Sequence, residues 1–156
     1  MKVVRWMTAV ATIASVLSVQ AQDRALGAVG NAEVILYRFP GVLDSGGLTA
    51  TAFHCTNFSG VMETIRIVVR DQNAGVVANA SFNVPHLQTI TVVTHPVILY
   101  AAAILFTGGI SQGTAAIAAT STSLVCTAMT IDAASSSPQG IALHGVRFNP
   151  IPGTQE

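Results

Sequence analysis

The chain has 156 residues, of which only 9% are charged, and its seven basic side chains balance its seven acidic ones. Hydrophobic residues make up 51% of it, which is enough to bury the core of one domain. With so few basic residues there is no stripe that could release counterions from a phosphate backbone, so we expect no nucleic-acid binding.

The N-terminal segment has the three parts of a secretory signal peptide. Lys2 and Arg5 precede an uncharged run of small and apolar residues at 7–19, and the small residues Val19 and Ala21 stand three positions and one position before a cut. The run is shorter than the roughly 20 apolar residues of a membrane-spanning helix. We therefore predict a signal peptide, a secreted or periplasmic product, and no membrane span once the signal is removed.

The predicted cut divides the chain into a signal peptide at 1–21 and a mature domain at 22–156. Loss of Lys2 and Arg5 leaves five arginines against the seven acidic side chains, a net charge of −2. Lys2 is the only lysine in the sequence, so the mature chain has none and Schiff-base chemistry is excluded.

Short β-rich runs separated by turn residues follow along the mature chain. The clearest run is 62–70, in which Ile65, Ile67 and Val69 alternate with polar positions, the pattern of a half-buried strand. A first strand is expected to stop before Pro40-Gly41. The other predicted strands are 32–39, 48–57, 76–84, 87–93, 113–120, 124–131 and 141–148. Eight short strands without βα alternation predict an all-β fold, an antiparallel two-sheet sandwich.

The apolar segment Val97–Phe106 (VILYAAAILF) does not alternate. It fits a fully buried strand or, with its three alanines, a short helix between sheets. It also fits an exposed apolar patch that contacts a protein partner or a second copy. The tentative contact residues in this segment are Val97, Ile98, Leu99, Tyr100 and Phe106.

The C-terminal tail is rich in proline. Phe148 is followed by Pro150 and Pro152, which end a strand and favour an extended backbone. The tail is either a disordered end or an extended peptide that lies against a neighbour's groove or sheet edge. On the second interpretation these three residues join the tentative partner contacts.

Cys55 and Cys126 are the only cysteines, and an even pair in an exported chain predicts a disulfide. Two buried free thiols or a metal site are the alternatives. With one cysteine in an early strand and one in a late strand, and Asn57 at the end of the first, the chain resembles the immunoglobulin-like sandwiches of exported bacterial proteins. That resemblance implies a bridge between the two sheets, although the mature chain has no Trp to pack on it and Leu124 replaces the usual Tyr.

The residue types that commonly serve in catalysis and metal binding form no recognised motif in this sequence. His54, His86, His95 and His144 stand outside any H-x-H or H-E-x-x-H pattern, and no serine lies in a G-x-S-x-G turn. We therefore predict no enzyme activity, no catalytic residues, no cofactor and no metal. If the histidines converge, zinc or copper are the metals suited to imidazole.

The sequence supports two functional hypotheses. The first is a non-catalytic structural or interaction module of the cell surface, envelope or a filament, which associates with itself or another protein through sheet edges and an apolar patch. The alternative is an extracytoplasmic ligand- or metal-binding module that uses clustered histidines.

Overall fold

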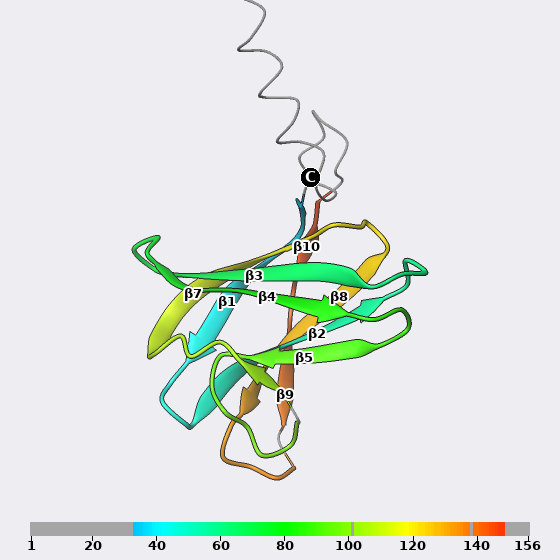
Figure 1. Cartoon of the computed structure of the whole chain (residues 1–156). Coiled ribbons are helices and arrows are strands. Elements are labelled where there is room, and N and C mark those ends of the chain that lie inside the picture. The colour runs from blue at the N-terminus through cyan, green and yellow to red at the C-terminus, as the bar shows by residue number, and fades with distance from the viewer. Residues whose placement is uncertain (1–32, 101, 138, 149–156) are drawn as a thin grey trace, which may run out of the picture. The chain divides into compact units, whose positions relative to one another are not determined.

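In the computed structural model, residues 33–100, 102–137 and 139–148 are described, and they contain ten β-strands and no helix (Figure 1). The predicted signal peptide and the prolines Pro150 and Pro152 lie outside these residues. The all-β prediction is confirmed for the part of the chain that is described. The strands are β1 (Val34–Asp44), β2 (Thr49–Asn57), β3 (Glu63–Asp71), β4 (Val76–Val84), β5 (Thr89–Val93), β6 (Ala103–Ile104), β7 (Ile110–Ala119), β8 (Leu124–Asp132), β9 (Gly140–Leu143) and β10 (Val146–Arg147).

The strands form one curled sheet, a half-barrel, with the order β4-β3-β7-β1-β2-β5-β6. The curl turns at the β1–β2 corner, where one Cα pair, Asp44 opposite Ala50, joins these two strands. Strand β8 pairs along the whole of β2. All pairs are antiparallel except β5 with β6, which run parallel. The sheet is therefore mixed, which corrects the antiparallel prediction; β6 comes from the apolar segment that showed no strand periodicity.

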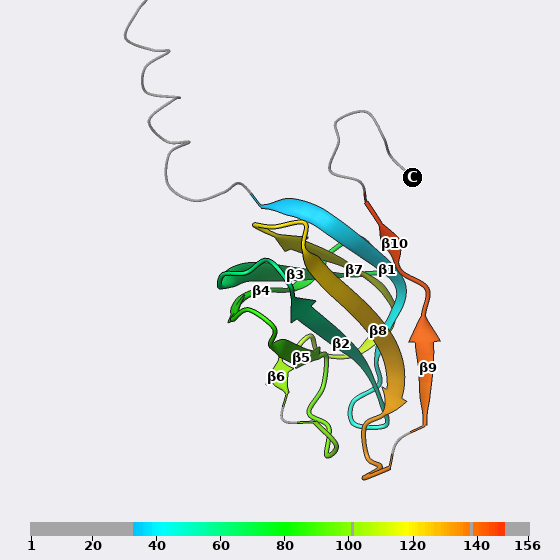
Figure 2. The same ribbon diagram turned by 90° about the vertical axis from the view of Figure 1, so that its right-hand side faces the viewer.

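Strands β9 and β10 close one side of the curl (Figure 2). β9 pairs with β8, and β10 pairs with β1 at Tyr37 and Arg38. The sequence predicted a single strand at 141–148, but the chain leaves β8 and crosses to β1 at His144-Gly145. A Cβ on Gly145 would lie 2.1 Å from a ring carbon of Phe39, so only glycine fits at this crossing.

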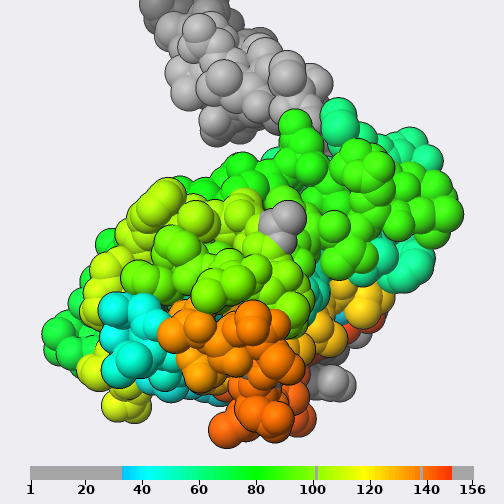
Figure 3. Space-filling model, turned by 90° about the horizontal axis from the view of Figure 1, so that it is seen from below, coloured from blue at the N-terminus to red at the C-terminus, as the bar shows by residue number. Residues whose placement is uncertain are grey.

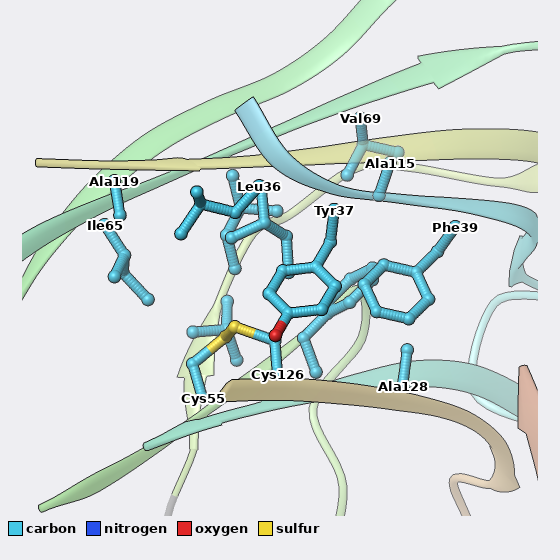
Figure 4. Packing of buried hydrophobic residues seen from close by; sticks show 14 of the residues in the cluster. Leu36, Tyr37, Phe39, Cys55, Ile65, Val69, Ala115, Ala119, Cys126 and Ala128 are labelled. Atoms are coloured by element: carbon cyan, nitrogen blue, oxygen red, sulfur yellow. A yellow bond between two sulfur atoms is a disulfide. The ribbon is translucent and has the colours of Figure 1, made fainter. Parts of the chain in front are cut away.

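The core lies inside the curl and collects the apolar faces of β1, β2, β3, β7 and β8 (Figure 4). Ile65, Ile67 and Val69 are fully buried, which confirms the period-two prediction for β3. The hydroxyl of the buried Tyr37 on β1 donates to the carbonyl oxygen of Leu124 on β8, at 3.1 Å, and so ties the two arms of the curl together.

Strand β1 is longer than the sequence predicted. It continues through Pro40 and Gly41 to Asp44, with register shifts against β7 on both sides of this turn signal. Gly41 takes a φ of 81°, which glycine adopts without strain. The bulges accommodate Pro40, whose missing N–H would otherwise interrupt a regular ladder.

The disulfide Cys55–Cys126 is present, but it joins two neighbouring strands and is not a bridge between sheets. Cys55 of β2 and Cys126 of β8 stand directly opposite each other, with their Cα atoms 4.2 Å apart. That spacing is close to the roughly 4.5 Å of a non-hydrogen-bonded antiparallel pair. The immunoglobulin resemblance therefore misplaced the bridge, because two alternating strands of similar pattern are equally compatible with neighbouring positions in one sheet.

The described residues of the apolar segment, 97–100 and 102–106, form neither a helix nor a fully buried strand. Val97, Tyr100, Ala102 and Ile104 pack as partly buried side chains over the outer surface of β2 and β8, on Ala50, Ala52, Val93, Ile131 and Ala133. This second cluster explains why the first half of β2, at 50–53, is buried on both faces. No helix long and apolar enough to cross a bilayer occurs in the part of the chain that the structure describes.

Candidate functional site

The edge strand β4 is the longest uncovered strand edge among the described residues. β4 ends the sheet and pairs only with β3. Its nine residues, VVANASFNV, include no charged residue and no proline. Proteins usually protect such edges with lysine, proline, inward-pointing charges or very short strands. β4 carries none of these devices, although a bulge interrupts its pairing with β3 near Val77.

The core-facing side of β4 is also incompletely covered. Val77, Ala78, Ala80 and Phe82 contact the core but stay partly exposed, and so do Ile90 on β5 and Ala103 on β6. β4 and β5–β6 are the two ends of the curled sheet, so this apolar strip lies along its open side. An additional strand beside β4 would complete the hydrogen bonding of the edge and bury part of the strip.

A second apolar surface is formed by two loops at one end of the strands. Phe58, Val61, Met62 and Leu87 are each between 52% and 64% exposed. The backbone N–H of Leu87 donates to the carbonyl oxygen of Asn57, at 2.7 Å, so the two loops are held together. None of these four residues was among the predicted contacts, because the predicted patch was sought in the long apolar run 97–106; the apolar residues between and beside the predicted strands 48–57 and 62–70 were the available signal.

Asn57 holds the first of these loops in place. Its fully buried side chain donates from Nδ2 to the carbonyl oxygens of Val61 and Val84, at 2.6 and 2.8 Å. Its Oδ1 accepts from the backbone N–H of Ser59 at 2.8 Å. The exposed apolar side chains therefore project from a hydrogen-bonded loop, which lowers the entropy cost of burying them against a partner.

The contact residues predicted from the sequence fall into separate groups. Ile98, Leu99 and Phe106 are exposed, whereas Val97 and Tyr100 are partly buried in the second cluster. Phe148 is partly buried, and the guanidinium of Arg38 lies 5.3 Å from its ring centre, a cation–π contact. Thus only part of the predicted patch is exposed apolar surface.

The lower end of the molecule brings together the β1–β2 turn (cyan), the residues after β8 (orange) and the segment after β5 (yellow-green) (Figure 3). Leu48 and Ile141 are 70% and 75% exposed, and both line a shallow pocket at this end. The backbone N–H of Ala133 donates to the carbonyl oxygen of Leu48 at 3.0 Å, which fixes the two loops side by side.

A small pocket of about 330 Å³ contains a carboxylate–histidine pair, Asp44 and His95. The side chain of Asp44 is buried; its Oδ1 accepts from the backbone N–H of Gly46 at 3.0 Å, and its Oδ2 accepts from the hydroxyl of Thr107 at 3.0 Å. Nδ1 of His95 lies 3.4 Å from Oδ1. The exposed ring of Phe106 is part of the wall. A carboxylate that faces Nδ1 orients an imidazole so that Nε2 is available to a ligand.

The other histidines lie in different environments. Nδ1 of His54 is 3.0 Å from the hydroxyl of Thr91, its ring packs edge-on against Tyr100, and burial lowers the pKa of His54 below its ordinary value of 6.5. Nδ1 of His86 accepts from the backbone N–H of Gly60. His144 is exposed at the β9–β10 crossing. Among the described residues, no three His, Cys, Asp or Glu side chains are grouped closely enough to hold a metal ion.

Comparison with protein families, with curated proteins and with solved structures finds no match for this chain.

Proposed function

We propose that this protein is a non-catalytic, secreted or periplasmic structural or interaction module that binds protein through the β4 edge and exposed apolar loops. The observation that carries the proposal is β4, an uncharged nine-residue strand at the end of the sheet. A strand edge of this kind offers a row of backbone N–H and C=O groups to another strand, and the alternate side chains give that pairing its register.

The apolar loops support the same function. Exposed large apolar side chains scattered singly are ordinary, but Phe58, Val61, Met62 and Leu87 are adjacent in two hydrogen-bonded loops. The low charge of the mature chain fits as well, because few charged groups need to be desolvated on association. For the fold, we propose that the half-barrel is a two-sheet, immunoglobulin-like sandwich, supported by the single Cα pair that joins β1 to β2 at the corner.

The proposal is tested by light scattering and negative-stain microscopy of the mature, disulfide-bonded protein over a range of concentrations, together with sedimentation with envelope fractions. We expect either discrete oligomers or filaments, or retention on the envelope. A protein that stays monomeric at high concentration and binds no envelope fraction contradicts the proposed function.

The Asp44–His95 pocket supports a second candidate function, a binding module for a small ligand or a metal ion. Elemental analysis of the protein incubated with zinc or copper tests the metal form, and NMR titration with small polar compounds tests the ligand form. We expect stoichiometric binding that His95→Ala abolishes and that His144→Ala, a change at an exposed histidine outside the pocket, leaves intact. Binding that survives His95→Ala contradicts this candidate.

A further inference from the structure

We infer that the strand which pairs with β4 is β4 of a second copy of this chain, in an antiparallel pair about a two-fold axis. The inference rests on the proposed function, since it names the partner of the same edge. Antiparallel pairing of identical strands is isologous: each residue on one strand has the same neighbour as its counterpart on the other.

Two requirements restrict the register of such a pair. Residues directly opposite each other must point to the same face of the sheet, so the two-fold axis has to pass through a residue position and not between two residues. The pairing must also use the regular part of β4, which begins after the bulge near Val77 and includes Ala78–Phe82. This regular part runs to Val84, and Ala80, the centre of the nine-residue strand, lies within it. We place the axis at Ala80, so that each copy of Ala80 faces the other.

The side chains are complementary in this register. On the core-facing side, the bulky Phe82 stands opposite the small Ala78 of the second copy, so a large side chain meets a small one on each side of the axis. On the outer side, Asn79 stands opposite Ser81 of the second copy, and both side chains are exposed and able to hydrogen-bond. The central five residues, Ala78–Phe82, thus match their own reversed sequence on both faces.

The neighbouring strand places one charged side chain, Arg66, beside the centre of this pair. Arg66 of β3 stands opposite Ser81, and its guanidinium lies 2.6 Å from a carboxylate oxygen of Glu33. The charge beside the edge is therefore already paired. The partly exposed Phe82, Ala80 and Ala78 of each copy would lose further contact with water as the two sheets join.

The first experiment places like charges across the proposed axis. In N79K/S81K, the lysine introduced at position 79 of each copy faces the lysine introduced at position 81 of the other, whereas both positions are exposed in the single molecule. We expect the dimer dissociation constant, measured by analytical ultracentrifugation, to rise on the order of tenfold or more. N79E/S81E is expected to behave in the same way, and an equimolar mixture of the two variants is expected to restore a dimer.

The matched control is Q112K/T114K. It adds the same charge at two exposed positions of the interior strand β7, and we expect it to dimerise like the wild type. The second experiment mixes the single variants N79C and S81C under mild oxidation, with the native cysteines buried in their bridge. We expect the mixed disulfide dimer to exceed the homodimer of either variant. Circular dichroism and urea unfolding check that each variant is folded.

The outcomes separate this inference from the proposed function. If the wild type assembles and N79K/S81K assembles equally well, the β4 pairing is overturned, and of the proposed function only association through the apolar loops stands. If the wild type is monomeric but N79K/S81K abolishes envelope binding, the edge serves a different protein, and the second-copy inference is again overturned. A monomer without any partner contradicts both.

Discussion

The disulfide Cys55–Cys126 should supply a large part of the stability of this domain. The two cysteines are separated by 71 residues, so the bridge closes a loop that contains β3, β4, β5, β6 and β7. Closing a loop of this length removes about 15 cal/mol/K from the entropy of the unfolded chain, or about 4 kcal/mol at 25 °C. The total free energy of unfolding of a domain of this size is about 5–15 kcal/mol. Reduction is therefore expected to remove a substantial share of the free energy of unfolding.

The structure also predicts what reduction leaves unchanged. Nine consecutive Cα pairs align β2 with β8, from Thr49 opposite Asp132 to Asn57 opposite Leu124, so the register does not depend on the bridge. We expect reduced protein to keep the same fold with a lower free energy of unfolding. The change acts on the unfolded chain, and the native contacts other than the S–S bond remain.

Urea unfolding followed by far-ultraviolet circular dichroism measures this, since residues 22–156 contain no tryptophan to report by fluorescence. Three samples separate the contributions: the oxidised wild type, the wild type refolded in reductant, and C55A/C126A. The difference in free energy of unfolding between the first two samples gives the contribution of the cross-link. The difference between the last two gives the contribution of packing the two sulfur atoms, whose residues are only 1% and 6% exposed. If the reduced wild type unfolds within about 1 kcal/mol of the oxidised protein, the loop-entropy argument is refuted.

Three further predictions concern single positions. Gly145→Ala should lower the free energy of unfolding by about 1–3 kcal/mol or more, measured by urea denaturation, because its Cβ would overlap the ring of Phe39. Asn57→Ala should cost about 2 kcal/mol or more in the same assay, because it leaves buried carbonyl groups without their donor. The pKa of His54 is lowered by burial, so the unfolded chain binds a proton more readily and the free energy of unfolding should fall as the pH drops below 6.5. His54→Gln should reduce this slope, measured between about pH 7.5 and about pH 5.5.

Each of these changes has a control in the same chain. Gly109→Ala has no atom closer than 3.9 Å to its new Cβ, Asn83→Ala removes an exposed amide, and His144→Gln removes an exposed imidazole. All three should change the free energy of unfolding by about 0.5 kcal/mol or less, the usual range for such surface changes. Equal losses in a variant and its control would show that the named contact is not the cause. An unchanged pH slope in His54→Gln would mean that another group produces it.

Much of the secondary structure of the domain could be predicted from local patterns. The alternation of Ile65, Ile67 and Val69 identified both β3 and its buried face, since successive side chains of a strand point to opposite sides. Residues 76–84 were predicted with the bounds of β4. The errors occurred where tertiary contacts override local signals: Pro40 lies within β1 because bulges accommodate it, and Gly145 interrupts a predicted strand because Phe39 occupies the adjacent space.

The candidate sites were harder to predict. The sequence singled out His95 only as one of four histidines, and nothing in it paired His95 with Asp44, which is distant in the chain. The apolar segment after β5 was divided by the fold into side chains that cover β2 and side chains that remain exposed. That division depends on which surface the segment contacts. Because the segment has no periodicity, its sequence does not predict which of its side chains become buried.

Local sequence patterns were enough to predict that the domain is built of strands, which side chains of β3 face the core, and that two cysteines could form a bridge. These properties are local, because they follow from the two-residue period of a strand and from residue chemistry. Three features follow from the packing of the whole domain: β7 lies between β1 and β3, the bridge joins neighbouring strands, and β4 is left at the open edge. The physical reason is that backbone hydrogen-bonding groups are the same in every strand, so the choice of neighbours depends on long-range packing of the whole domain.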